Sequence, residues 1–259
     1  MNLNFLCKFF AAIFQTFQNL SGKKMTFTGG VITIGSLLWD KCAKRREWRQ
    51  RSLKDIETKT PVSLRIRYGR ESGDKRHHTY TMIFSNHPTT EFGQGYIVGF
   101  NEAIENPEIL ERQAFALAKA EGISADQRRL LSKSWGAVGL LVNPRIDSKD
   151  KIGGDRIKSS WTNLFQKYGD SCDPLQFRIG DEASVIDKDG FLHIDWTPEM
   201  NAFDFLNATP VVPKPKTVLT ARTIAERMIE EKYTDYFDNN RANNITTFQD
   251  NEILKFLRR

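Results

Sequence analysis

The sequence predicts an α+β fold in which helices flank a mixed β-structure and a helical tail ends the chain. Two observations predict this class. Short runs of β-branched and aromatic residues recur between residues 31 and 142, as in strands. Apolar residues spaced three and four apart occur over 106–122 and again after residue 218, as in amphipathic helices. A chain of 259 residues is long enough for one large domain or two small ones, and no internal repeat is visible.

Composition narrows the class of protein further. Hydrophobic residues make up 39% of the chain and charged residues 27%, which is typical of a globular protein with a sizeable core. The net charge of +6 is a mild basic bias with interleaved acidic residues, so there is no clear nucleic-acid signal. The cysteines Cys7, Cys42 and Cys172 form no Cys-x-x-Cys pair, which argues against a disulfide framework and a zinc site. We therefore predict a cytoplasmic protein.

Residues 1–24 are predicted to be an amphipathic extension. Apolar residues recur there every four positions: Phe5, Phe9, Ile13 and Phe17. The stretch is too short and too broken by polar residues to span a bilayer, and no basic region precedes it as in a signal peptide. Residues 3–20 could instead contact a membrane surface or a partner. Alternatively, residues 1–24 are not native coding sequence. The codons for residues 21–24 would form a purine-rich stretch that resembles a bacterial ribosome-binding site just before Met25. We therefore hypothesise that the functional core starts near Met25.

The first strand is predicted over 31–34 and ends abruptly at Gly35-Ser36. Glycine permits a sharp turn, and the serine adds a hydroxyl and a backbone N–H at the strand exit. Such a turn either aims backbone donors at an anion or carbonyl, or is an ordinary exit from a strand. The basic cluster over 41–51, around Trp48, follows. It is interpreted either as a phosphate-binding segment or as a solvated helix face.

The middle of the chain contains the clearest helix. Asn106 is a good N-cap, Pro107 fits the first helical position, and Gly122 ends the helix. Its apolar stripe continues onto Glu121, where the helix dipole disfavours a negative charge. A residue that breaks two local rules is a candidate functional residue, and the alternative is a helix-end glutamate that reaches water.

The remaining elements follow from the same patterns. Further strands are predicted over 63–68, 79–84, 95–100, 135–142 and 191–196. Loops are predicted over 69–78 and 145–160, a hairpin turn over 187–190, and a Pro-rich connector over 207–218. Helices are expected over about 224–237 and 249–257. We divide the chain into the extension 1–24, a domain over 25–206, and a tail over 207–259 that packs on the same domain.

The order of the turn, the strands and the glutamate helix resembles the γ-glutamylcyclotransferase-like family. Gly35, Ser36 and Leu37 match the family's Tyr-Gly-Ser-Leu turn, and 117–122 matches its glutamate segment, across roughly residues 29–145. Ile34 stands where the family has tyrosine. The resemblance implies a mixed β-barrel of that type, with insertions, flanking helices and the helical tail.

The resemblance also implies a reaction. The α-amine of a small γ-glutamyl amide attacks its own γ-carbonyl, which yields 5-oxoproline and releases an amine, with no metal or other cofactor. Glu121 would be the general acid/base, because burial raises the pKa of a carboxyl toward neutrality. The turn from Ile34 to Leu37 would hold the substrate. Further candidates for carboxylate binding at the barrel mouth are Arg65, Arg67 and Tyr80, although alternating basic residues on a strand are also simply solvated.

Two rival functions remain open at this stage. The first is an inactive binding or regulatory module of the same fold, which the replacement of the family's tyrosine by Ile34 favours. A structure in which Glu121 pairs with a cation and has no cavity beside it would support this function. The second is a nucleic-acid or host-interaction protein that uses residues 41–51 and the C-terminal helices.

Overall fold

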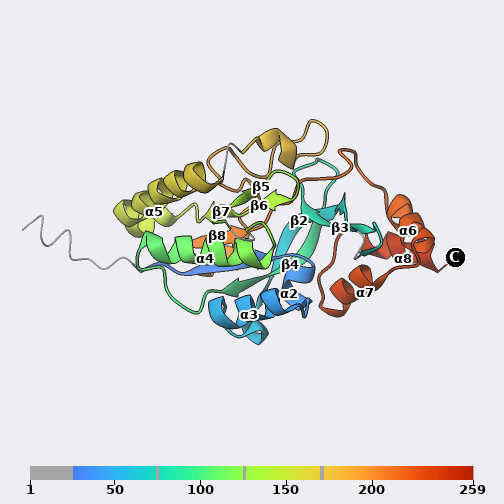
Figure 1. Ribbon diagram of the computed structural model, residues 1–259, viewed down its shortest axis with the longest axis horizontal. Coiled ribbons are helices and arrows are strands. Elements are labelled where there is room, and N and C mark those ends of the chain that lie inside the picture. The colour runs from blue at the N-terminus through green and yellow to red at the C-terminus, as the bar shows by residue number, and fades with distance from the viewer. Residues whose placement is uncertain (1–25, 74–75, 125–126, 170–171, 259) are drawn as a thin grey trace, which may run out of the picture.

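The computed structural model describes residues 26–73, 76–124, 127–169 and 172–258. The amphipathic extension predicted over 1–24 lies outside these residues. Within them, strands and helices are mixed along the chain, so the α+β prediction is confirmed (Figure 1). None of the helices described is long and apolar enough to cross a membrane.

Six strands form one curled sheet in the order β3-β2-β4-β1-β8-β7. The strands are β1 (Gly29–Thr33), β2 (Thr60–Glu71), β3 (Tyr80–Phe84), β4 (Phe92–Gly99), β7 (Gly139–Val142) and β8 (Phe205–Ala208). A separate pair consists of β5 (Leu131–Ser132) and β6 (Gly136–Ala137). The six strands make a half-barrel, and the described residues do not close it into the barrel that the resemblance implies.

The pairing pattern explains the curl. The first part of β2 pairs with β4, with Thr60 opposite Ile97, and its second part pairs with β3, with Glu71 opposite Tyr80. A single 12-residue strand therefore belongs to two successive ladders. In the middle of the sheet, β1 is antiparallel to β4 and parallel to β8. All five β1 residues are buried, and Val31 and Ile32 have the β-branched, apolar side chains that are typical of a buried strand.

The helices pack around this sheet. They are α2 (Ser36–Trp39), α3 (Ala43–Ser52), α4 (Pro107–Ala120), α5 (Ile146–Tyr168), α6 (Ala221–Glu230), α7 (Asp235–Ala242) and α8 (Asp250–Leu257). Short 3₁₀ turns occur at η1 (Ile56–Thr58), η3 (Pro174–Phe177) and η4 (Pro198–Ala202). Helix α4 packs against α3 and α5, while α6 packs against α8 and α7 against α2. In Figure 1 the C-terminal helices lie at the opposite end of the molecule from α5.

Helix α4 has the ends that its sequence predicts. The Asn106 side chain accepts a hydrogen bond from the Ile109 N–H, and Pro107 occupies the first turn. At the other end, Gly122 has a φ of 76°, and the Ile123 N–H bonds to the Ala118 carbonyl at 2.9 Å. This is a Schellman motif, in which only glycine takes the left-handed position without strain. Glu121 therefore has a defined place at the helix C-cap rather than at a fraying end.

The loop predicted over 145–160 is wrong, because this segment belongs to α5. Gly153 and Gly154 led to the prediction, since glycine disfavours helices by about 1 kcal/mol relative to alanine. Their role is close packing: a Cβ on Gly153 would lie 2.9 Å from the Phe27 ring, and one on Gly154 would lie 3.0 Å from Ile146. The helix is kinked at Asp150, whose backbone is not helical.

The strand predicted over 135–142 is divided. Gly136–Ala137 pairs with β5, whereas Gly139–Val142 pairs with β8. The predicted loop over 69–78 begins later than expected, because β2 continues to Glu71. After the connector, the three tail helices bury apolar residues in the same core as the sheet: Ile224, Phe237 and Ile253.

Candidate active site

The turn after β1 is built around a left-handed glycine. Gly35 has a φ of 68° and leads directly into the four-residue helix α2. A Cβ at this position would overlap the hydroxyl of Tyr236, which belongs to α7. Both the backbone conformation and the approach of Tyr236 therefore require glycine here. The result is that Ser36 and Leu37 are buried at the carboxyl end of β1.

A cavity lies between this turn and the C-terminal end of α4. Ile34, Ser36, Leu37 and Glu121 all line it. Its volume is about 40 Å³, which is room for about three water molecules. The glutamate and the turn, 85 residues apart in the sequence, therefore line one cavity.

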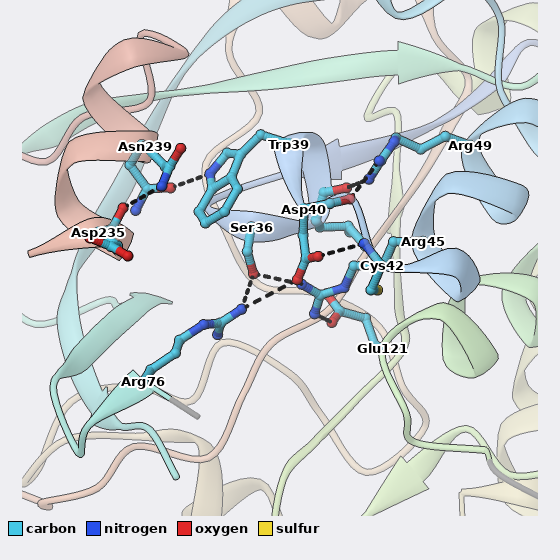
Figure 2. Close-up of polar contacts among 12 residues, drawn as sticks. Ser36, Trp39, Asp40, Cys42, Arg45, Arg49, Arg76, Glu121, Asp235 and Asn239 are labelled. Atoms are coloured by element: carbon cyan, nitrogen blue, oxygen red, sulfur yellow. Dashed lines mark hydrogen bonds and ion pairs between the residues drawn. The ribbon is translucent and has the colours of Figure 1, made fainter. Parts of the chain in front are cut away.

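Arg45 joins the two sides of the site (Figure 2). One guanidinium nitrogen donates to Ser36 Oγ at 2.7 Å and to Asp40 Oδ2 at 3.0 Å. The other donates to Glu121 Oε2 at 2.7 Å. The side chains of Arg45 and Glu121 are each 10% exposed, so this ion pair is largely shielded from water. Burial alone would lower the pKa of Arg45, but the charges of Glu121 and Asp40 outweigh it and raise that pKa.

A second guanidinium reaches the same serine. Arg76 donates to Ser36 Oγ at 2.9 Å, and it lies 3.7 Å from Asp40 and 5.1 Å above the Tyr236 ring. For Asp40, burial tends to raise the pKa, but the Cys42 N–H bond and the two guanidinium groups lower it overall. The site thus contains two carboxylates and two guanidinium groups around one hydroxyl.

Helix α7, in the C-terminal part of the chain, also contributes to the lining of the cavity. Trp39 at the end of α2 donates from Nε1 to Asn240 Oδ1 at 2.7 Å, and its ring centre lies 6.0 Å from that of Tyr236. Tyr236 is 4% exposed, lines the cavity, and accepts a hydrogen bond from the Met82 N–H at 3.3 Å. Burial raises the pKa of its phenol, which is therefore neutral near pH 7.

The three residues proposed for carboxylate binding at the barrel mouth, Arg65, Arg67 and Tyr80, do not line this cavity. Arg65 forms an ion pair with Asp195 at 2.9 Å. Arg67 is 1% exposed and donates to the Thr90 hydroxyl and the Leu219 carbonyl. Tyr80 is buried on β3, with its hydroxyl beside Arg227. Residues 65 and 67 lie on the same face of β2, and their side chains hold the segments that cover that face.

The sequence did not single out the cations that the site uses. The cluster over 41–51 reads as a solvated face or a phosphate site, yet Arg45 points into the cavity and Arg49 donates to the carbonyls of Leu37 and Asp40. A local signal for Arg45 exists, because it lies three residues before the buried Trp48 on one face of α3. For Arg76 and Tyr236 there is no such signal, since they reach the site from other elements.

The described residues contain no group of three or more His, Cys, Asp or Glu side chains placed to hold a metal ion. Comparisons of the chain with protein-family models, curated proteins and solved structures found no match. The resemblance to the γ-glutamylcyclotransferase-like family therefore depends on the turn and the glutamate segment alone.

Proposed function

We propose that the cavity is the active site of an enzyme that cyclises a γ-glutamyl amide to 5-oxoproline and releases an amine. The observation that carries this proposal is that Glu121, Ser36 and Leu37 line one cavity, with Arg45 joining Glu121 to Ser36. The reaction needs a proton acceptor and donor beside a site that holds the substrate folded, and it needs no nucleophile from the enzyme.

Glu121 is suited to moving the proton. Arg45 occupies Oε2, while Oε1 accepts no hydrogen bond from the residues that the structure describes. In the proposed step, Oε1 removes a proton from the substrate α-ammonium, whose nitrogen then attacks the γ-carbonyl carbon. The bond from that carbon to the leaving nitrogen breaks, and Glu121 gives the proton to that nitrogen. The ring nitrogen loses its second proton through Glu121 to the released amine, which departs as an ammonium ion and leaves the neutral lactam. The atoms balance without water or an oxidant.

Ser36 and the two guanidinium groups would hold the substrate. Because Arg45 and Arg76 both donate to Ser36 Oγ, the lone pairs of this oxygen are used and its O–H is left to donate. The hydroxyl and Arg76 then face a substrate carboxylate or the oxyanion that forms at the γ-carbon. Donors that are already held in place need little reorganisation during the reaction.

The size of the cavity sets a requirement on binding. The cavity has room for about three water molecules and opens to solvent, so a γ-glutamyl group would extend out of its mouth or displace lining side chains. Arg76 is the more exposed of the two cations, at 21% of its side chain against 10% for Arg45. Substrate entry on the Arg76 side is therefore the route that disturbs the buried ion pair least.

The test replaces Glu121 with glutamine and measures release of 5-oxoproline from γ-glutamyl peptides and γ-glutamyl-lysine. Loss of the general acid/base lowers kcat by about 10²–10⁴-fold. The matched control is Glu108→Gln, on an exposed side chain in the first turn of the same helix, with activity like that of the wild type. Turnover retained in Glu121→Gln rejects the role of Glu121, and no turnover by the wild-type protein rejects the function.

A second candidate function is a binding module without turnover. The ion pair between Arg45 and Glu121 favours it, because a carboxylate held by a guanidinium is a structural counter-ion as well as a base. Binding of γ-glutamyl compounds, seen by calorimetry without any release of 5-oxoproline, would support this module over the enzyme.

A further inference from the structure

The lining of the cavity includes two polar side chains that the proposed reaction leaves unused. Trp135, just before β6, and Thr209, just after β8, line the same cavity as Glu121. The apolar part of the lining includes Ile32, Phe84 and Val211. The cavity is therefore lined by both ionic and apolar side chains.

Both side chains have a buried polar atom without a partner. Trp135 Nε1 and Thr209 Oγ1 are shielded from solvent, and neither forms a hydrogen bond with any part of the chain that is described. Thr209 as a residue is 8% exposed. Buried polar groups in proteins are nearly always hydrogen-bonded, so two such atoms in residues that line one cavity point to a partner from outside the chain.

Contacts to the backbone and the ring hold Trp135 in place. Its backbone carbonyl accepts from the Val212 N–H at 2.8 Å. The Arg70 guanidinium lies 4.6 Å from the ring centre and donates to the carbonyls of Ser134 and Val212 on either side. The hydrogen bonds that hold this part of the cavity lining therefore do not involve the indole N–H of Trp135 or the hydroxyl of Thr209.

We propose that Trp135 and Thr209 form an oxygen-binding subsite for the part of the ligand beyond the γ-amide. An indole N–H can only donate, so its partner must be a hydrogen-bond acceptor. The chemistry that fits is a carbonyl or carboxylate oxygen on the released amine, next to an apolar surface. This inference rests on the proposed function, because it takes the ligand to be a γ-glutamyl amide with its α-amine at Glu121.

The kinetic test compares three substrates of similar shape: γ-glutamylglycine, γ-glutamylglycinamide and γ-glutamylethylamide. The first carries a carboxylate, the second a neutral carbonyl, and the third neither. In Trp135→Phe and in Thr209→Val, kcat/KM is expected to fall about tenfold for a substrate with the oxygen and less than twofold for the ethylamide. The first two substrates distinguish carboxylate from carbonyl binding. Trp196→Phe, whose indole bonds to Asn201 away from the cavity, is the control and leaves all three values unchanged.

A binding test is independent of turnover. In protein labelled with ¹⁵N-tryptophan, the indole signal missing from the Trp135→Phe spectrum is assigned to Trp135. Titration of the Glu121→Gln variant with γ-glutamylglycine is expected to shift this signal, and γ-glutamylethylamide is expected to leave it nearly unchanged. If Trp135→Phe does not fold, Thr209→Val keeps the side-chain shape and tests the subsite separately.

The outcomes separate the two proposals. Release of 5-oxoproline with equal losses for all substrates, or with an unmoved Trp135 signal, overturns the subsite and leaves the enzyme function standing. It would mean that water alone satisfies the two atoms. A Trp135 signal that shifts with γ-glutamylglycine, while no substrate is turned over, supports the subsite and rejects the enzyme function.

Discussion

Arg45 is the residue on which the candidate site depends most. Among the described residues, Arg45 alone hydrogen-bonds to both Ser36 and Glu121, and it also pairs with Asp40. Taking these charges out of water costs several kcal/mol for each ion, and the mutual contacts offset that cost. Removing one partner therefore leaves uncompensated charge in a place that water hardly reaches.

Arg45→Met is expected to lower the free energy of unfolding by about 3 kcal/mol, measured by urea denaturation, because Glu121 loses its counter-ion and Asp40 keeps only Arg76. Arg46→Met is the control: its exposed side chain should change stability by less than about 0.5 kcal/mol. In Arg45→Met/Glu121→Gln the loss should be smaller than the sum of the single losses. Additive losses would show that the ion pair contributes no coupling.

The contact between Gly35 and Tyr236 gives a second prediction at this scale. Gly35→Ala is expected to destabilise the protein by about 1–3 kcal/mol, because φ is positive there and the new Cβ overlaps the Tyr236 hydroxyl. Combining it with Tyr236→Phe removes the hydroxyl, which is the nearest atom, and leaves Cζ at 3.1 Å, so it should recover part of the loss. Gly73→Ala, at a glycine with open space around it, is the control for urea unfolding. No loss in Gly35→Ala would contradict the turn geometry.

At the scale of elements, the start of α8 contains a buried carboxyl. Asp250 Oδ1 accepts from the N–H and hydroxyl of Thr247 at 3.0 and 2.6 Å, while Oδ2 has no partner among the residues described. Burial raises the pKa of Asp250 to about 6, although the Thr247 bonds act in the opposite direction. The fold therefore favours the protonated form of this side chain.

This raised pKa predicts a pH dependence of stability. Between about pH 4 and pH 6 the folded protein holds the Asp250 proton and the unfolded chain releases it, so the contribution of this group to stability falls as pH rises. Asp250→Asn keeps the Oδ1 acceptor and cannot ionise. Relative to the wild type, it should gain stability by up to about 3 kcal/mol between pH 4 and pH 8.

The measurement is the difference in unfolding free energy between variant and wild type, taken at pH 4 and at pH 8. In this difference, the contributions of groups that titrate alike in both proteins cancel. Glu252→Gln, exposed on the same helix, serves as the control with a difference that does not change with pH. A constant difference for Asp250→Asn would reject the raised pKa.

Elements also differ in how well their sequence reports them. The ends of α4 were predictable because Asn106, Pro107 and Gly122 act through hydrogen bonds within a few residues. Helix α5 was not, because Gly153 and Gly154 are retained for contacts with Phe27 and Ile146. From local propensity alone, such a pair of glycines predicts a loop. The reason for these glycines is instead tertiary packing, which local propensity does not describe.

For the whole molecule, the described core begins at Phe27. Its ring is 1% exposed, meets Phe205 edge-on at 5.2 Å, and lies against the position of Gly153. Its backbone also pairs with Ile104. The first residues after Met25 thus join the sheet, α5 and the segment before α4.

This arrangement gives a prediction for the hypothesis that the functional core starts near Met25. Deleting residues 1–24 is expected to leave the free energy of unfolding within about 0.5 kcal/mol of the full chain. Phe27→Ala should cost about 3–5 kcal/mol, because it removes a buried aromatic ring. Urea unfolding of both proteins checks this, with Phe92→Ala, at a 48% exposed ring, as the control of small effect. A deletion that prevents folding or abolishes activity would reject the hypothesis.

The sequence by itself determined the α+β class, both ends of α4, the glycine turn after β1, and Glu121 as a residue out of place on its helix. These are consequences of local rules that act over a few positions. Only the tertiary structure decided what surrounds the cavity. Arg76, Trp135, Thr209 and Tyr236 arrive there from four separate segments, and no spacing in the chain relates them to the turn. The curl of the sheet and the docking of α7 bring them together, because both depend on burial of a shared core rather than on local preference.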